Sequence, residues 1–322
     1  MPNIDMPLEQ LRAYQGRNPR PHDFDEFWDA GVAEMHALDA RVELVLHDLK
    51  AHHAECFDLY FSGVGGARVH AKYLRPKNEG PHPAVVIFHG YSGNSGEWNE
   101  KLAWVAQGYS VAALDCRGQG GVSEDVGGVR GNTLHGHIIR GLENALDGEP
   151  QKLLFRQIYL DAAQLARIVM AMPEVDAARV GALGGSQGGG LTLACAALEP
   201  SIKKAAPTFP FLCDYQRVWE MDLAVNAYEE LRAWFRHFDP QHQREREVWT
   251  ALGYIDNQHL ASRIRAEVLM PIGLMDSVCP PSTQFAAWNK ITSKKEVLIY
   301  PDFGHEGLPG ANDAVFDFMA DL

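Results

Sequence analysis

The sequence predicts an α/β protein whose sheet is mostly parallel and doubly wound. Residues 83–88 form a continuous apolar run, which is typical of a strand buried on both faces of a parallel sheet. From this run to the C-terminus, strand and helix patterns alternate, and such alternation favours a sheet covered by helices. An antiparallel hairpin is expected before it, with strands at 56–61 and 69–74 around the glycine-rich turn 63–66.

The other expected elements follow from the spacing of apolar residues. A short helix is expected over 23–38, where apolar residues recur at near-helical spacing and acidic residues occupy the first turn. The remaining strands are short apolar runs, and the remaining helices have apolar faces. In chain order we expect helix 97–107, strand 109–114, helix 153–171, strand 179–183, a glycine-rich turn at 184–190 that opens a helix, strand 268–274, helix 281–291, strand 297–300 and helix 311–321.

The 322 residues are expected to form a single domain, residues 1–322. A chain of this length can bury about three quarters of the surface that it exposes when extended. Two segments depart from the alternation: an N-terminal extension over about 1–50, and a segment at 214–264 that is rich in aromatic and charged residues. The second is interpreted as a helical insertion.

Charge and cysteine usage exclude several classes of partner and cofactor. The net charge of −13 repels phosphate backbones and anionic membranes, so we expect neither nucleic acid nor a membrane as a partner. No signal-like segment or apolar run of about 18 residues is present, which predicts a cytoplasmic protein. The five cysteines lack Cys-x-x-Cys spacing, and the glycines at 118–121 lack a nucleotide-binding pattern. We therefore expect no metal and no cofactor.

A candidate nucleophile lies in the sequence Gly184-Gly185-Ser186-Gln187-Gly188. The pattern G-x-S-x-G follows an expected strand and opens an expected helix, which is the context of a nucleophile elbow. Its glycines permit a sharp turn that exposes the serine hydroxyl, and the helix N-terminus favours developing negative charge. The alternative is an ordinary glycine-rich turn between a strand and a helix.

A serine nucleophile needs a base and an acid that orients the base, and α/β-hydrolases supply them in the chain order Ser, Asp or Glu, His. Of the 14 histidines, His305 alone follows the last apolar strands. Asp276 comes directly after the expected strand 268–274 and is the preferred acid. Three alternatives remain: Asp276 could cap the helix that begins near Pro280, Asp302 could be the acid, and His305 could be an ordinary surface residue.

Two backbone N–H groups are candidate donors to the oxyanion of a tetrahedral intermediate. One belongs to Gln187, directly after the nucleophile, and the other to Tyr91, in the loop after the strand 83–88. His89 precedes the elbow in the chain and is interpreted as structural, while Gly90 allows the backbone to approach closely.

Four segments together resemble one family. Residues 117–119 resemble its R-G-Q motif, 184–188 its G-x-S-Q-G elbow, 305–306 its terminal H-E pair and 89–91 its oxyanion loop. Segments 23–29 and 73–76 are also similar. The chain thus resembles, from about residue 5 to its end, the acetyl xylan esterase and cephalosporin C deacetylase group, carbohydrate esterase family 7, which has the α/β-hydrolase fold.

The resemblance implies an intracellular serine esterase that removes acetyl groups from small acetylated sugars, such as xylo-oligosaccharides, and from cephalosporin C. By position, Ser186 would be the nucleophile, His305 the base and then the acid, Asp276 the orienting acid, and Tyr91 and Gln187 the oxyanion donors. The family forms a homo-hexamer, a trimer of dimers, with its active sites facing an internal cavity. Two other functions remain open: a serine peptidase of the prolyl-oligopeptidase type and a non-catalytic α/β-hydrolase scaffold used for binding.

Overall fold

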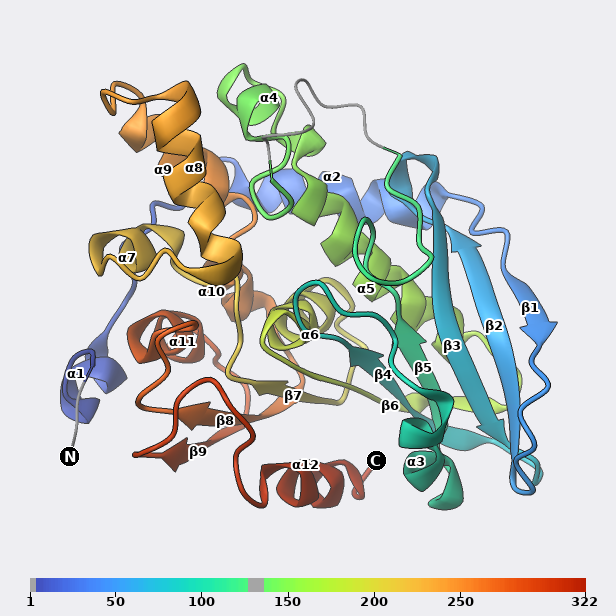
Figure 1. The fold of residues 1–322 in the computed structure, drawn as a ribbon. Helices are drawn as coiled ribbons and strands as arrows, with labels where there is room; N and C mark the ends of the chain where they lie inside the picture. The colour runs from blue at the N-terminus through green and yellow to red at the C-terminus, as the bar shows by residue number, and fades with distance from the viewer. Residues whose placement is uncertain (1–3, 127–135) are drawn as a thin grey trace.

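The structure is a computed structural model that describes residues 4–126 and 136–322 (Figure 1). Nine of its strands form one sheet in the order β1-β2-β3-β5-β4-β6-β7-β8-β9. The strands are β1 (Glu43–Leu46), β2 (Ala54–Ser62), β3 (Arg68–Pro76), β4 (His82–Phe88), β5 (Ser110–Leu114), β6 (Val175–Gly185), β7 (Lys204–Thr208), β8 (Glu267–Gly273) and β9 (Lys295–Tyr300).

The sheet is parallel from β5 to β9 and antiparallel at its N-terminal edge. Strand β4 pairs in parallel with β5 on one side and β6 on the other, with Val86 beside Ala112 and Ala182. Strands β1, β2 and β3 pair antiparallel with one another, and β3 is antiparallel to β5. The predicted mostly parallel α/β sheet with an N-terminal hairpin is therefore confirmed.

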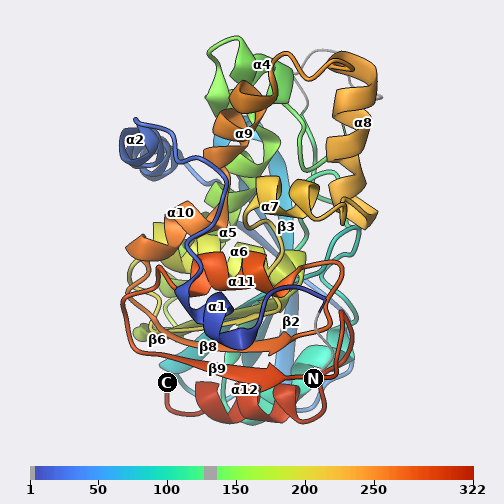
Figure 2. The same cartoon turned by 90° about the vertical axis from the view of Figure 1, so that its left-hand side faces the viewer.

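Helices cover both faces of the sheet (Figures 1 and 2). Helices α3 and α12 lie on one face, and α5, α6 and α11 lie on the other. The α-helices are α1 (Leu8–Ala13), α2 (Phe24–Ala37), α3 (Leu102–Ala106), α4 (Leu142–Leu146), α5 (Leu154–Met170), α6 (Gln187–Leu198), α7 (Tyr215–Glu220), α8 (Glu229–Phe238), α9 (Glu245–Gly253), α10 (Asn257–Leu260), α11 (Pro281–Trp288) and α12 (Ala311–Met319). Short 3-10 helices are η1 (Val64–Gly66), η2 (Trp98–Lys101), η4 (Pro150–Lys152), η5 (Asn226–Tyr228) and η6 (Ala261–Arg263).

The sheet separates two hydrophobic cores because successive side chains of a strand point to opposite faces. In β4, Val86 belongs to the larger core, which contains the buried residues of α5, α6 and α11. Its neighbour Val85 belongs to the smaller core, with Val105 of α3 and Val315 of α12. Both valines are fully buried, which explains why residues 83–88 are apolar without alternation.

Two strands of the sheet were not predicted. Strand β7 (Lys204–Thr208) lies between α6 and the insertion, and β1 (Glu43–Leu46) is an exposed edge strand. The segment 214–264 is helical, as expected, and contains α7 to α10. In both views α8 and α9 stand away from the sheet, on the side of α4 (Figures 1 and 2). Within the described residues, no helix is both long and apolar enough to cross a bilayer.

The N-terminal extension is held by buried carboxylates of distant segments. Asp214, at the start of the insertion, accepts hydrogen bonds from the Tyr14 hydroxyl at 2.7 Å and from the backbone N–H of Asn18 at 2.8 Å. In turn, the Asp5 carboxylate accepts the N–H of Ser282 in α11 at 2.7 Å. The extension therefore joins the insertion to α11.

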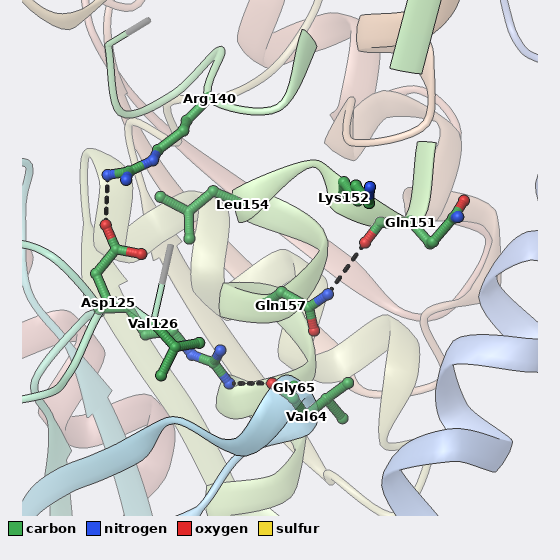
Figure 3. A pocket seen from close by; sticks show the side chains of 10 residues that line it. Val64, Gly65, Asp125, Val126, Arg140, Gln151, Lys152, Leu154 and Gln157 are labelled. Atoms are coloured by element: carbon green, nitrogen blue, oxygen red, sulfur yellow. Dashed lines mark hydrogen bonds and ion pairs between the residues drawn. The ribbon is translucent and has the colours of Figure 1, made fainter. Parts of the chain in front are cut away.

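A buried ion pair joins three segments beside a small cavity. Arg117, 2% exposed, donates to both carboxylate oxygens of Asp161 in α5, at 2.5 and 2.6 Å, and to the carbonyl of Val64 at 2.9 Å. Arg117 also lines a cavity of about 130 Å³, around which Figure 3 shows Val64, Leu154 and Gln157. Burial raises the pKa of Asp161, and Arg117 opposes that shift. The pair ties the loop after β5 to α5 and to the hairpin turn.

Replacing Asp161 by Asn is expected to lower the free energy of unfolding by about 3–5 kcal/mol, because the Arg117 charge stays buried without its partner. The matched control is Asp222→Asn, which removes an exposed ion pair with Arg232 and should cost less than about 1 kcal/mol. Denaturant unfolding of the two variants measures the difference. Similar losses in both would contradict this account.

Candidate active site

Ser186 stands at a strained junction between β6 and α6. Its backbone has φ 58° and ψ −121°, a conformation that residues with a side chain rarely adopt. The junction is held by the Ser186 N–H, which donates to the carbonyl of Thr208 at 3.0 Å. In addition, the Ser186 carbonyl accepts the N–H groups of Gly190 at 3.0 Å and Phe211 at 2.9 Å. Backbone hydrogen bonds on both sides therefore fix the turn that the G-x-S-x-G pattern predicts.

Glycines around Ser186 allow the elbow to pack directly on the end of β4. A Cβ atom at Gly188 would lie 2.0 Å from the carbonyl oxygen of Phe88, and one at Gly184 would lie 2.5 Å from the same oxygen. Both distances are far below an ordinary contact, so neither position accepts a side chain in this packing. The close approach brings Ser186 next to the loop that follows β4.

The three side chains expected to act together form a hydrogen-bonded chain. His305 Nε2 lies 3.0 Å from Ser186 Oγ, and His305 Nδ1 lies 2.9 Å from Asp276 Oδ2. Asp276 is fully buried after β8, and its other oxygen accepts the N–H groups of Val278 at 2.9 Å and Cys279 at 2.7 Å. Asp276 thus organises its own turn and also contacts the histidine, whereas the helix α11 begins after Pro280 without a side-chain cap.

The hydrogen bonds favour one of the two candidate acids and one tautomer of the histidine. Asp302 is exposed, and its carboxylate takes part in none of the hydrogen bonds of the described residues. An ionised carboxylate can only accept hydrogen bonds, so His305 Nδ1 carries the ring proton and donates a hydrogen bond to Asp276. The lone pair of Nε2 then faces the Ser186 hydroxyl, as a general base requires.

The backbone N–H groups of Tyr91 and Gln187 have no acceptor among the described residues. Gln187 is the first residue of α6, where N–H groups point out of the helix end. Tyr91 lies in the loop after β4, on which the elbow packs. Both donors are therefore available to an oxygen atom of a ligand next to Ser186.

His89 has a structural role in the loop that carries Tyr91. The Cys116 N–H donates to His89 Nε2 at 2.9 Å, so the ring proton is on Nδ1, which donates to the Gly90 carbonyl at 2.7 Å. Burial lowers the pKa of His89, which favours this neutral form. The carbonyl and N–H of one peptide point in opposite directions, so this bond also orients the N–H of Tyr91.

Sequence reasoning missed a pair of glutamines beside the elbow. The side-chain amides of Gln119 and Gln187 bond reciprocally, at 2.7 and 3.0 Å. Gln119 belongs to the R-G-Q segment and Gln187 to the elbow, so the two motifs meet in space. Both glutamines are visible in their motifs, but no local sequence pattern indicates that two residues 68 positions apart form a pair.

One group of potential metal ligands is found in the described part of the chain, and it coincides with this site. It consists of Asp276, Cys279 and His305. Asp276 and His305 already bond to each other, which leaves the buried Cys279 thiol as the remaining donor. A metal ion here would compete with the hydrogen-bonded chain that reaches Ser186.

The arrangement is suited to acyl transfer. A hydroxyl is in hydrogen-bond contact with a base, and a buried carboxylate orients that base. The unbonded N–H groups of Tyr91 and Gln187 belong to the loop and to the helix turn that adjoin Ser186. These are the parts needed to form and stabilise a tetrahedral intermediate at a carbonyl carbon.

The chain is similar to known proteins along its whole length. The family model described as acetyl xylan esterase (AXE1) matches residues 1–322. The structure of acetyl xylan esterase 1 from Thermoanaerobacterium sp. JW/SL YS485 is similar at 59% identity with a TM-score of 0.95, over 98% of this chain and 99% of that chain. An acetyl xylan esterase from Paenibacillus sp. R4 follows at 40% identity and a TM-score of 0.92, with the same coverage.

A more distant relative is acetyl esterase Axe7A of Xylanibacter ruminicola, 27% identical over 297 residues. The match covers 91% of this chain but spans only 64% of that relative's length. Because the family model matches the whole chain and both structures align over nearly all of it, the chain belongs to the acetyl xylan esterase family, as the four motifs predicted.

Proposed function

We propose that the chain is a serine esterase that removes O-acetyl groups from small acetylated carbohydrates, such as xylo-oligosaccharides, and from cephalosporin C. The observation that carries the proposal is the hydrogen-bonded chain from Asp276 through His305 to Ser186 at the strained elbow. Membership of the acetyl xylan esterase family supports acetyl esters as the substrate class.

The first half-reaction forms an acetyl-enzyme. Ser186 Oγ attacks the acetyl carbonyl carbon while His305 Nε2 takes the hydroxyl proton, and the N–H groups of Tyr91 and Gln187 stabilise the oxyanion. The intermediate then collapses, the C–O bond to the alcohol breaks, and His305 protonates the leaving oxygen. Asp276 keeps the imidazole in the correct tautomer and stabilises its positive charge.

The second half-reaction releases acetate. Water attacks the acetyl carbon with His305 as the base, and the proton returns to Ser186 as the ester bond breaks. The first proton transfer uses the existing contact between Ser186 and His305, and the later transfers pass through the same imidazole, so the proposed route calls for no cofactor.

The proposal is tested with p-nitrophenyl esters. The acetate should be cleaved at least about tenfold faster than the butyrate by kcat/KM, because a deacetylase needs an acyl pocket sized for acetyl and forcing methylenes into such a pocket costs roughly 1–3 kcal/mol. Ser186→Ala should fold normally and lose more than nine tenths of the activity. Equal or rising efficiency with chain length would indicate a general carboxylesterase, and cleavage of peptides without acetate release would indicate the peptidase.

The assignment of the acid is tested by a matched pair of variants. Asp276→Asn should lower kcat on the order of 10³–10⁴-fold, because an amide can stabilise the wrong imidazole tautomer. Asp302→Asn, at an exposed carboxylate three residues from His305, should stay within about threefold of the wild type. If the two effects were reversed, Asp302 would be the acid.

We also propose that the chain assembles as a homo-hexamer, a trimer of dimers whose active sites face an internal cavity. The resemblance of the motifs to those of the family supports this assembly. Light scattering at assay concentration should give a mass near six times the 35.7 kDa of the chain. A monomer mass would refute the hexamer.

Enclosed active sites would also affect the choice of substrate. Intact polymeric acetylxylan should then be a poorer substrate than acetylated oligosaccharides.

A further inference from the structure

The loop that carries Tyr91 is rich in glycine and leaves its tyrosine partly exposed. Glycines stand at positions 90 and 93, Ser92 has a positive φ of 60°, and the Tyr91 side chain is 37% exposed. The peptide that joins Gly90 to Tyr91 is anchored at its carbonyl group, because this carbonyl accepts both His89 Nδ1–H at 2.7 Å and the Gly93 N–H at 3.1 Å. The position of its N–H group, which belongs to Tyr91, also depends on what holds the tyrosine side chain.

A carboxylate of the helical insertion holds the tyrosine. The Tyr91 hydroxyl donates to Glu230 Oε1 at 3.0 Å, and Glu230 is the second residue of α8. The other oxygen, Oε2, accepts three backbone N–H groups, from His137 at 2.8 Å, Ile138 at 2.7 Å and Ile139 at 3.2 Å. Burial raises the pKa of Glu230, and these hydrogen bonds oppose the shift. A side chain that accepts from four donors is firmly fixed, so it is a rigid anchor for the tyrosine.

The same anchor connects to the second oxyanion donor. The Tyr91 ring meets the His137 ring edge-on, with centroids 6.0 Å apart. His137 Nε2–H donates to the Arg117 carbonyl at 2.8 Å, and its Nδ1 accepts the Gln119 amide at 3.2 Å. Burial lowers the pKa of His137, which keeps it in the neutral form that these bonds require.

Gln119 in turn pairs with the side chain of Gln187. The side chains of Tyr91 and Gln187, whose N–H groups are the candidate oxyanion donors, are thus linked through Glu230, His137 and Gln119. This series of contacts includes none of Ser186, His305 and Asp276. It connects the two candidate oxyanion donors to the helical insertion through Glu230.

We propose that Glu230 is a positioning residue for the oxyanion hole, which fixes the Tyr91 N–H beside Ser186 by holding the tyrosine hydroxyl. The inference rests on the proposed esterase function. An oxyanion donor must sit 2.7–3.1 Å from the oxygen atom of the transition state, and losing one outright costs about 10²–10³ in kcat. Releasing the tether leaves the donor present but loosened, so the expected loss is smaller, about tenfold.

The central test is Tyr91→Phe in the full chain, assayed on p-nitrophenyl acetate. The variant keeps the ring and the backbone N–H and removes only the hydroxyl that Glu230 binds. We expect kcat, counted per Ser186 titrated by an organophosphate, to fall about tenfold while KM changes less than twofold. Glu229→Gln is the matched control, since Glu229 is exposed one position away on the same helix, and it should match the wild type.

Glu230 variants show whether the glutamate acts through the tyrosine. In Glu230→Gln the amide oxygen can still accept from the backbone donors, and the amide N–H can donate to the tyrosine hydroxyl. The kcat of this variant should therefore stay within about threefold of the wild type. Glu230→Ala should lower kcat at least as much as Tyr91→Phe, because it also removes the acceptor of three backbone N–H groups, and the double variant should lose no more than Glu230→Ala alone.

Three outcomes would overturn the inference. A wild-type kcat for Tyr91→Phe would do so even if Glu230→Ala failed to fold, and so would multiplicative losses in the double variant. A tenfold rise in KM at constant kcat would assign Tyr91 to substrate binding instead. Failure of the proposed function looks different, because the wild-type protein would then release no acetate at all.

Discussion

The first turn of α6 packs against the backbones at the ends of β4 and β7 with no side chain between them. A Cβ atom at Gly189 would lie 2.7 Å from the Thr208 carbonyl, just as one at Gly188 would lie 2.0 Å from that of Phe88. This backbone contact places Ser186 between two strand ends and gives the Tyr91 loop its place beside the nucleophile. The positive φ of Ser186 persists because hydrogen bonds to Thr208 and Phe211 compensate for its strain.

The sequence was informative where the physical signal is local. The elbow glycines and the apolar strand before them are visible in a short window, and the chain order of α/β-hydrolases then pointed to Asp276 and His305. Strand β7 was not, because it carries a lysine and a proline in five residues. Lys204 fits there since its ammonium group reaches the Phe318 carbonyl at 2.6 Å, on the α12 side of the sheet. The Tyr91–Glu230 contact spans 139 positions, which no periodicity encodes.

The aromatic residues of the insertion show how composition can suggest either a ligand pocket or a core. Most of them pack on one another. The ring centroids of Trp219 and Phe235 are 4.8 Å apart, and Phe235 stacks on His242 with ring centroids 4.2 Å apart. Phe235 is 2% exposed, and Trp249 is 2% exposed as well. These rings therefore stabilise the insertion itself. Its contribution to the candidate site comes from a charged residue, Glu230, at the start of α8.

The N-terminal extension has a consequence for the order in which the chain folds during synthesis. Asn18 binds Asp214, which is 196 residues further along, and Asp5 binds Ser282, 277 residues away. At about 5–20 residues per second, roughly 10–60 s pass on the ribosome before these partners exist. Residues 5–18 are thus translated well before the residues that they bind, and they find these native contacts late. The extension then binds both the insertion and α11, which also pack directly on each other through α7 and α10.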